Sequence, residues 1–444
     1  MMKQVFTVLL LFVISAGFLI SCEDMFGSKQ DSITDEIFED GRLDPNLIVE
    51  DVGYVALLPF WDTFNKPTDI FVGYDELVYV TDEDGLHVLD RAGRKYLTLS
   101  EAADFDISGS QAASLRNAVS VTQDRLLNVY VAARIDTVIA AVDPDITWNL
   151  PAVYKIRNAN GAGPVELLQV MVHPFMDASR ATAASQRNRL NRDIPDNDEF
   201  VEITGLSTLA NNELYVTRRG PRNRTGEAIT QDNTVLIMSP RSDNPALMRN
   251  TSQIRALNPN SPSLTSAIDL TDIASFATPP QRDNVPSDRS FLITQGSPDP
   301  DNPREIPFRV LWVNAVDTPD GIEYRSNPNL LNRDTTRARS FLYDQNRFTD
   351  PSGVAFSGDE RAHLFVVDAA RDSLYLFQSN GIEGVNPPAG SSATRAINVS
   401  FGGTGNGARE FDNPSGVAYF RRIVYVADTN NNRISRFRLN TDFE

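Results

Sequence analysis

The chain has 444 residues, of which 41% are hydrophobic and 23% charged, and this composition excludes a disordered tail protein, a collagen and a polytopic membrane protein. With 59 acidic against 41 basic side chains, the formal net charge is -18, which argues against a general nucleic-acid binder that relies on a cationic surface. One cysteine and three histidines leave little material for disulfide frameworks, thiolate zinc sites or histidine-based catalysis.

The first 22 residues have the pattern of a signal peptide, with Lys3 followed by an apolar run from Val5 to Ile20. This run is short for a membrane-spanning helix. Residues 19–22, Leu-Ile-Ser-Cys, resemble the lipobox of bacterial lipoproteins, in which the cysteine receives diacylglycerol and becomes the first residue after cleavage. An ordinary secretory signal that contains a cysteine is the alternative. Because Cys22 is the only cysteine of the chain, we predict a signal peptide over residues 1–21 and lipidation of Cys22.

Lipidation would anchor the mature chain to a membrane without spanning it, since several acyl chains bury enough methylene groups for stable attachment. The resemblance implies an extracytoplasmic location, which we expect to be the outer membrane of a Gram-negative bacterium, on its periplasmic side or at the cell surface. Residues 23–51 carry ten acidic side chains against Lys29 and Arg42. Because a segment with this charge repels itself and stays extended, we predict a flexible tether over residues 22–51.

Two segments near the C-terminus match each other closely, and each holds three short runs of β-branched or aromatic residues separated by turn residues. Both begin with Pro-Ser-Gly-Val-Ala, at Pro351 and at Pro414. In both copies an aspartate, Asp368 or Asp428, stands nine residues before a closing phenylalanine. Each copy predicts three consecutive antiparallel strands: 351–356, 364–368 and 373–377 in the first, and 414–419, 423–428 and 433–437 in the second.

These residues resemble the NHL-repeat family, whose pattern runs from Pro-x-Gly-Val/Ile-Ala through a Tyr-Val-x-Asp strand to Asn-x-Arg-Ile and a final Phe. The glycine-rich stretch that begins at Phe401 also resembles the lead into such a repeat. The resemblance implies a β-propeller, in which small twisted sheets stand around an axis because one such sheet cannot bury both faces alone. At Asp428 to Arg433 we expect a structural turn, in which Asp and Asn satisfy backbone amides and Arg433 pairs back, with a calcium loop as the alternative.

Further copies lie upstream, a clear one first and weaker ones after it: 67–89, 118–156, 203–238 and 291–325. In the last of these, we take Phe291 to Thr294 as the first strand. Six units result, so we predict an all-β fold, a six-bladed β-propeller of four-stranded antiparallel blades over residues 52–444. The repeats are clearest at 64–100, 348–380 and 411–440.

The last unit lacks material for a fourth strand, because only five residues follow Leu439. Residues Val52 to Leu58 form an otherwise unassigned apolar strand just before the first unit. We therefore predict that this N-terminal strand pairs with the last blade, closes the ring and removes an exposed sheet edge.

Three long insertions, at 134–151, 177–193 and 218–233, gather at blades two and three on the face that carries the loops between second and third strands. The first forms an apolar lobe with Trp148, and the second predicts a short helical insertion capped by Asp177. Trp and Arg are the side chains that most often contribute the largest share of binding energy at protein interfaces. The guanidinium group of arginine also binds carboxylates and phosphates through two parallel hydrogen bonds. We therefore predict a recognition patch for a protein or an anionic glycan. The alternative is that these loops pack on one another while their arginines neutralise neighbouring acids. The candidate partner-binding residues are Trp148, Arg180, Arg187, Arg189, Arg218, Arg219, Arg222 and Arg224.

No catalytic residue can be named from the sequence. We expect structural roles for His87, His173 and His363, and a rigid turn in place of a calcium site at residues 297–303. No cofactor is expected, with calcium as the open option. The predicted function is a membrane-anchored, non-catalytic binding or scaffolding protein with a protein or glycan partner and no nucleic acid. Because some six-bladed relatives are enzymes, the alternative is a metal-dependent lactonase-like hydrolase or lyase with its site on the ring axis.

Overall fold

The structure is a computed structural model that describes most of the chain from residue 51 onward together with a short strand before it. The described residues are 42–43, 51–105, 113–139, 146–173, 199–221, 232–254, 267–279, 288–296 and 306–443. Among them, no helix is both long and apolar enough to cross a membrane.

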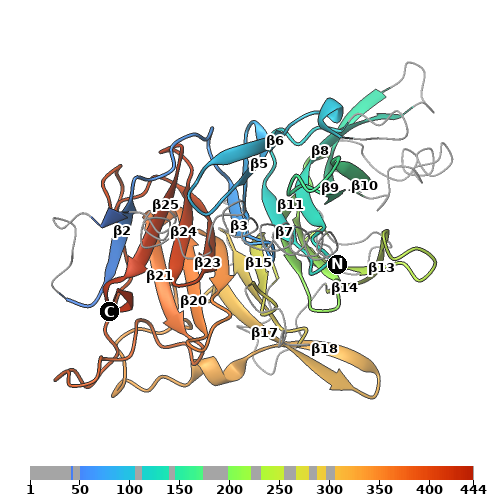
Figure 1. The fold of residues 1–444 in the computed structure, drawn as a ribbon. Coiled ribbons are helices and arrows are strands. Elements are labelled where there is room, and N and C mark those ends of the chain that lie inside the picture. Colours follow the sequence, from blue (N-terminus) through green and yellow to red (C-terminus); the bar gives the residue numbers. More distant parts are fainter. Residues whose placement is uncertain are drawn as a thin grey trace, which may run out of the picture.

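Six four-stranded antiparallel blades stand around a common axis, as the repeats predict (Figure 1). Blade 1 holds β3 (Asp69–Val72), β4 (Val78–Asp82), β5 (Gly85–Leu89) and β6 (Lys95–Leu99). Blade 2 holds β7 (Ser120–Gln123), β8 (Val129–Ile139), β9 (Ile146–Arg157) and β10 (Glu166–Val172). Blade 3 holds β11 (Glu202–Thr208), β12 (Leu214–Arg219), β13 (Thr234–Pro240) and β14 (Met248–Ile254).

The other three blades follow in chain order. Blade 4 holds β15 (Leu270–Ser275), β16 (Phe291–Gln295), β17 (Val310–Thr318) and β18 (Gly321–Ser326). Blade 5 holds β19 (Pro351–Phe356), β20 (His363–Asp368), β21 (Ser373–Gln378) and β22 (Phe401–Gly402). Blade 6 holds β23 (Pro414–Phe420), β24 (Ile423–Asp428), β25 (Arg433–Leu439) and the N-terminal β2 (Tyr54–Leu58). Short 3-10 helices lie at η2 (Ala102–Asp104), η5 (Pro328–Leu331), η6 (Ala369–Arg371) and η7 (Asn440–Asp442).

The N-terminal strand closes the ring, which confirms the prediction for Val52 to Leu58. β2 pairs antiparallel with β25, with Tyr54 opposite Leu439 and Ala56 opposite Phe437. Figure 1 shows the blue β2 beside the red strands of the C-terminal blade. A further strand, β1 (Arg42–Leu43), pairs with the outer edge of β2 and lies inside the segment that the sequence assigns to the tether.

Two details of the predicted strand pattern are wrong. The first strand of blade 4 is β15, so Phe291 to Thr294 belongs to the second strand. The insertion at 134–151 is an extension of the β8–β9 hairpin, which stays paired as far as Ile139 and Ile146. Side-chain burial alternates along this segment, since Trp148 and Leu150 are buried while Asn149 between them is exposed. Successive side chains of a strand point to opposite faces of the sheet, so this alternation is the pattern of a strand. The predicted helix at 177–193 lies outside the described residues.

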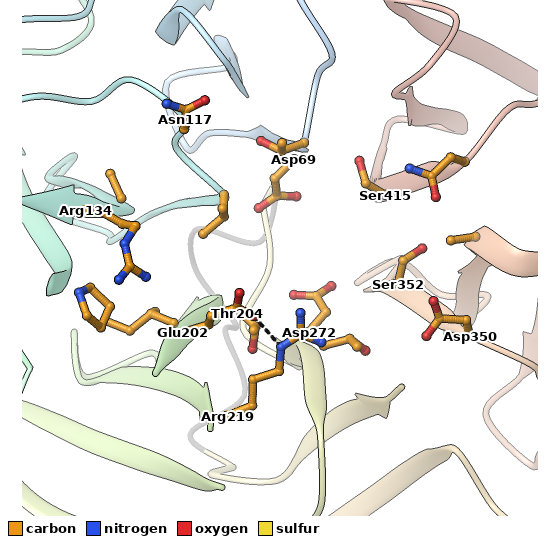
Figure 2. Close-up of a pocket in the computed structure, with 18 residues that line it drawn as sticks. Asp69, Asn117, Arg134, Glu202, Thr204, Arg219, Asp272, Asp350, Ser352 and Ser415 are labelled. Atoms are coloured by element: carbon orange, nitrogen blue, oxygen red, sulfur yellow. Dashed lines mark hydrogen bonds and ion pairs between the residues drawn. The ribbon is translucent and has the colours of Figure 1, made fainter. Parts of the chain in front are cut away.

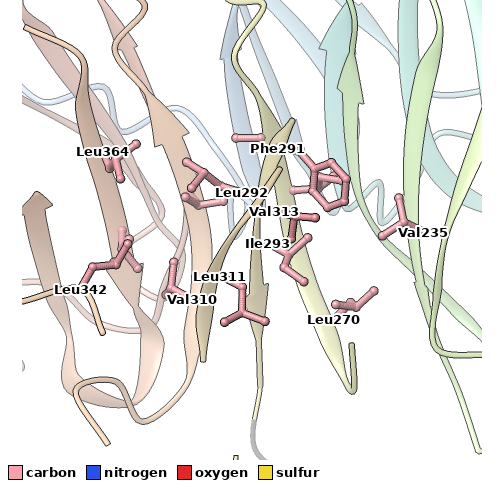
Figure 3. Close-up of a cluster of buried hydrophobic side chains, with 14 of the residues drawn as sticks. Val235, Leu270, Phe291, Leu292, Ile293, Val310, Leu311, Val313, Leu342 and Leu364 are labelled. Carbon is pink, nitrogen blue, oxygen red and sulfur yellow. The ribbon is translucent and has the colours of Figure 1, made fainter. Parts of the chain in front are cut away.

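Apolar side chains between neighbouring blades form the core, since each blade buries both of its faces against the blades beside it. Figure 3 shows one such cluster, in which Phe291 and Ile293 of β16 lie with Val310 and Leu311 of β17. The cluster extends from Val235 in blade 3 to blade 5. This packing fixes the angle of each blade and therefore the position of its inner strand at the axis.

Candidate ligand-binding site at the axial channel

A cavity of about 400 Å³ opens on the axis at the ends where the inner strands begin (Figure 2). All six blades contribute to its wall, because the inner strands β3, β7, β11, β15, β19 and β23 contact one another in a ring. We call this cavity the axial pocket. Its lining residues are Thr68, Asp69, Asn117, Val119, Ala133, Arg134, Pro151, Glu202, Ile203, Thr204, Arg219, Thr271, Asp272, Asp350, Ser352, Ala369, Asn413 and Ser415.

The repeat explains part of the composition of the axial pocket, through two successive positions of each inner-strand motif. The first position lines the pocket in all six blades, and the second lines it in blades 1 and 4. The first of them is a hydroxyl residue in five blades and Val119 in blade 2: Thr68, Val119, Thr204, Thr271, Ser352 and Ser415. The next position is an aspartate in blades 1 and 4 and a small residue in the others: Asp69, Ser120, Gly205, Asp272, Gly353 and Gly416.

Hydroxyl residues link neighbouring blades at four of the six junctions. Thr68 Oγ1 donates to the Ala118 carbonyl of blade 2 at 2.6 Å. Thr271 Oγ1 donates to the Pro351 carbonyl of blade 5, and Ser352 Oγ to the Pro414 carbonyl of blade 6, both also at 2.6 Å. Ser415 Oγ lies 3.1 Å from the Pro67 carbonyl and continues the ring into blade 1. We call these contacts the hydroxyl links.

Arginines take the place of the hydroxyl links on both sides of blade 3. Val119 has no hydroxyl to donate, and Thr204 Oγ1 turns to Thr217 Oγ1 of its own blade at 3.0 Å. Arg134 of blade 2 instead donates to the Glu199 and Val201 carbonyls that lead into blade 3, at 2.6 and 3.2 Å. These blade junctions are also linked nearer the other end of the axis, where Thr208 Oγ1 donates to Gln123 O and Ser275 Oγ donates to Thr208 O.

Arg219 links blade 3 to blade 4 at the rim of the axial pocket. Its Nε donates to Oε2 of Glu202 at 2.6 Å (Figure 2), and its Nη1 lies 3.3 Å from Oδ1 of Asp269. A methyl group at Gly296 would lie 2.5 Å from Oδ2 of Asp269 and 3.1 Å from Oδ1 of Asp350, so these two carboxyl groups approach each other across this glycine. Burial raises the pKa of Asp269, and the charge of Asp350 adds to that effect while Arg219 opposes it.

Two aspartates from opposite blades form the floor of the axial pocket. Asp69 Oδ2 accepts hydrogen bonds from the Val121 amide and the Ser120 hydroxyl, both at 2.9 Å. Asp272 Oδ2 accepts the Val354 amide at 2.9 Å. Burial raises the pKa of Asp69 from 3.8 to about 6. Burial also raises the pKa of Asp272 well above its ordinary value, and the charge of Asp69 across the axis raises it further.

A smaller cavity of about 60 Å³ lies below the two aspartates, which line both cavities. Apolar and hydroxyl side chains of the inner strands line it, and the segment after β15 runs along it. Tyr74 of blade 1 donates to the Ala277 carbonyl of that segment at 3.2 Å. The aspartates therefore lie between the wide axial pocket and the smaller cavity below it.

The predicted patch residues divide into three groups. Trp148 is 3% exposed and packs in the hydrophobic cluster of blade 2, so its indole contributes to the core of that blade. Arg218 is 2% exposed, donates through Nε to the Asp232 carbonyl and contacts Nδ1 of His173 at 3.1 Å. Arg219 lines the axial pocket. The remaining five, Arg180, Arg187, Arg189, Arg222 and Arg224, lie outside the described residues, so the patch as a whole stays a prediction.

The sequence interpretation missed the pocket residues Arg134, Asp69 and Asp272. A signal for the aspartates was present, because Thr-Asp at 68–69 and 271–272 stands where the C-terminal repeats have Ser-Gly. A methyl group at Gly416 would lie 2.8 Å from Oδ1 of Asp69, and the glycine of the preceding blade thus leaves room for the carboxyl group. No pattern in the sequence pointed to Arg134.

All three histidines are buried. His87 Nε2 lies 2.7 Å from Oδ2 of the buried Asp82, and His363 is buried at the start of β20. Asp428 accepts from Asn431 Nδ2 at 3.0 Å and from Arg433 Nε at 2.8 Å, which confirms the predicted pairing of Arg433 within this turn. Within the described part of the chain, no three His, Cys, Asp or Glu side chains are grouped as metal ligands.

Comparison with known families agrees with the repeat pattern in the last blade. Residues 411–437 match the NHL repeat. No curated protein sequence matches the chain. Among solved structures, an auxiliary nutrient binding protein from Bacteroides thetaiotaomicron is similar at 10% identity over 90% of this chain and 75% of its own, with a TM-score of 0.44. A protein of the same description from Bacteroides ovatus has 11% identity over 90% and 75%, with a TM-score of 0.42. The PQQ-bound aldose sugar dehydrogenase from Streptomyces coelicolor has 11% identity over 88% and 99%, with a TM-score of 0.44.

Proposed function

We propose that this protein is a lipid-anchored, extracytoplasmic binding protein that takes a small polar ligand, such as a glycan unit, in the axial pocket. The observation that carries the proposal is the pocket itself. It has about 400 Å³ of space, it is walled by all six blades, and Thr, Ser and Asp side chains at the starts of the inner strands contribute to its polar lining. Such a wall is preorganised, so little conformational entropy is lost when a ligand binds.

The anchored location rests on the N-terminal sequence, where Cys22 follows a lipobox-like segment. We expect the wild-type chain to fractionate with membranes and a Cys22→Ser variant to lose that attachment, because the variant has no thiol to lipidate. A variant that remains membrane-bound would contradict lipid anchoring. The binding function is tested separately below.

Obstruction of the pocket tests the binding function. Val119 lines the mouth, is 40% exposed and belongs to the one blade without a hydroxyl at this position, so Val119→Trp fills the opening without removing a side-chain hydrogen bond. Leu126, 66% exposed in the β7–β8 turn of the same blade, gives the matched control Leu126→Trp. A screen of sugars, amines and carboxylic acids by thermal shift should find a ligand that stabilises the wild type and the control but not Val119→Trp. If the ligand stabilised all three proteins equally, the axial pocket would be excluded as its binding site.

The second candidate function is an enzyme with its site on the ring axis. Asp69 and Asp272 favour it, because a carboxyl group whose pKa is raised to about 6 suits general acid catalysis near neutral pH. In that case Asp272→Asn would abolish turnover of the ligand found in the screen while its binding persists. A ligand that is recovered unchanged after long incubation with the wild type would leave binding as the function.

A further inference from the structure

One sector of the axial pocket is apolar, and blade 2 provides most of it through Val119, Ala133 and Pro151. These residues stand at the same end of three neighbouring strands, because the Val119 amide donates to the Ala132 carbonyl and Pro151 lies opposite Arg134. Val119 is 40% exposed at the position where the other five blades have a hydroxyl residue. A ligand can therefore place an apolar group against blade 2 without burying a polar one.

The sector across the axis is polar, because blade 5 stands opposite blade 2 in the ring of six. Figure 2 shows Ser352 on the side of the cavity opposite Asn117 of blade 2. Ser352 Oγ donates its hydrogen to the Pro414 carbonyl at 2.6 Å, and its other contact is the Val367 carbonyl at 3.4 Å. A carbonyl cannot donate, so within the described part of the chain this oxygen receives no hydrogen and both of its lone pairs can accept from a ligand.

Two side-chain amides at the mouth are also available to a ligand. Asn117 precedes β7 and Asn413 precedes β23, and both are exposed and line the axial pocket. The main-chain amide of Asn413 donates to Oδ1 of Asp372 at 2.7 Å, which fixes the position of this residue. Among the described residues, none forms a hydrogen bond with the side-chain amide of Asn117 or Asn413. Such a group has donors and an acceptor, so it can bind hydroxyl groups in either direction.

The charged groups of the pocket bind one another or the main chain. Arg219 pairs with Glu202 and Asp269 at the rim. Arg134 donates to main-chain carbonyls and to the Asn149 side chain. Burial raises the pKa of both floor aspartates, which disfavours their charged forms. A neutral ligand therefore suits this wall better than an ion.

We propose that the ligand of the axial pocket is a 6-deoxyhexose, a neutral sugar in which a methyl group replaces the hydroxymethyl group. The methyl group contacts Val119 and Ala133, while hydroxyl groups on the other side of the ring donate to Ser352 and bind the amide of Asn413. A cavity of about 400 Å³ has room for a monosaccharide. This inference rests on the proposed function and names the class of ligand. The sugar is neutral, whereas the anionic glycan expected from the sequence concerned the arginine-rich loops.

Three series of sugars test the inference by calorimetry on the full-length chain. The series are built on galactose, glucose and mannose, and each holds the 6-deoxy sugar, the parent hexose and the uronate, which differ only at carbon six. In at least one series, we expect the 6-deoxy sugar to bind at least about fivefold more tightly than the other two members. The reason is that a hydroxyl or carboxylate group against apolar side chains loses hydrogen bonds to water.

Two variants test the placement of the sugar. Val119→Thr restores the hydroxyl of the other blades with little change in size, and should reduce the preference for the 6-deoxy sugar to about twofold or less. Asn413→Gly removes the amide, and glycine adopts the φ of 55° without strain. It should weaken binding about fivefold, which corresponds to about 1 kcal/mol. Asn346→Gly is the matched control, because Asn346 is exposed with a φ of 56° and does not line the pocket.

The outcomes separate this inference from the proposed function. The inference is overturned if no 6-deoxy sugar binds, or if the parent hexose or the uronate binds as tightly in every series. A preference that Val119→Thr leaves unchanged, or an affinity that Asn413→Gly leaves unchanged, also overturns it. In each of these cases the proposed function still stands if the thermal-shift screen yields a ligand of another class that Val119→Trp excludes, and it falls only if Val119→Trp and Leu126→Trp respond alike.

Discussion

His363 lies at the start of β20 among charged groups, yet burial dominates its pKa. Its ring packs edge-on against Phe365, with ring centroids 6.4 Å apart. Burial lowers the pKa of His363 from 6.5 to about 4, and the charge of Asp359, which acts in the opposite direction, does not restore it. The folded protein therefore holds this imidazole neutral at pH values where an exposed histidine is charged.

This pKa predicts a pH dependence of stability. Between pH 6.5 and pH 4 the unfolded chain binds a proton at residue 363 that the folded chain does not, so the free energy of unfolding falls as the pH is lowered through this window. The full effect is about 3 kcal/mol for a shift of this size. Urea unfolding should show that His363→Gln loses less stability than the wild type between pH 7 and pH 4. Parallel pH curves for the two proteins would contradict the assignment.

At the scale of strands, the hydroxyl links predict which inner-strand positions matter for stability. Thr271→Val removes the side-chain donor to the Pro351 carbonyl between blades 4 and 5. Loss of a partner from a buried carbonyl costs about 1 to 3 kcal/mol. Thr204→Val is the matched control, because the Thr204 hydroxyl bonds only within blade 3 and its partner Thr217 keeps the Gly205 carbonyl.

We expect chemical denaturation to show a clear loss for Thr271→Val and a smaller loss, below about 1 kcal/mol, for Thr204→Val. Hydrogen exchange should also accelerate in β15 and β19 of the first variant, since they lie on either side of the lost link. Equal losses in both variants would show that the hydroxyl links contribute nothing beyond the burial of the threonine side chains.

These strands also show how far the sequence can predict the fold. The closing role of Val52 to Leu58 followed from a count, because the last repeat lacked one strand and one apolar segment was unassigned. Blade 4 was assigned one strand late, since Phe291 to Thr294 is more apolar than β15 with its Asp272. The polar residue that obscured the strand is the one that faces the axis.

The pocket was harder to predict than the blades because its residues are distant in sequence. Asp69 and Asp272 stand about 200 positions apart, and only the closed ring places them across one axis. The burial of Trp148 was equally hidden, because a Trp between polar neighbours suits both a recognition loop and one face of a hairpin. The two-residue period of a strand predicts which side chains share a face of the sheet. The arrangement of the blades in the ring determines whether that face packs against a neighbouring blade or is exposed to solvent.

At the scale of the whole molecule, stability depends on a contact between the two ends of the folded chain. Ala56 of β2 is fully buried opposite Phe437 of β25, in a cluster that also includes Phe365 of blade 5. Without this pairing, β25 would be an open edge, and blades 6 and 1 would be joined by side-chain contacts such as those of Ser415 and Thr429 with the Pro67 carbonyl. We infer that the six blades unfold as one cooperative unit only while β2 is in place.

Ala56→Glu tests this dependence, because it buries a carboxylate among aromatic rings without a partner. The expected cost is at least about 3 kcal/mol in the free energy of unfolding. Ala162→Glu, at an exposed turn between β9 and β10, should be neutral within about 0.5 kcal/mol. Hydrogen exchange of Ala56→Glu should show faster exchange in β25 and in the neighbouring inner strands β3 and β23 than in blade 3, because the ring opens at the junction that β2 closes. A uniform increase across all blades would mean that closure stabilises the propeller no more than any other packed strand.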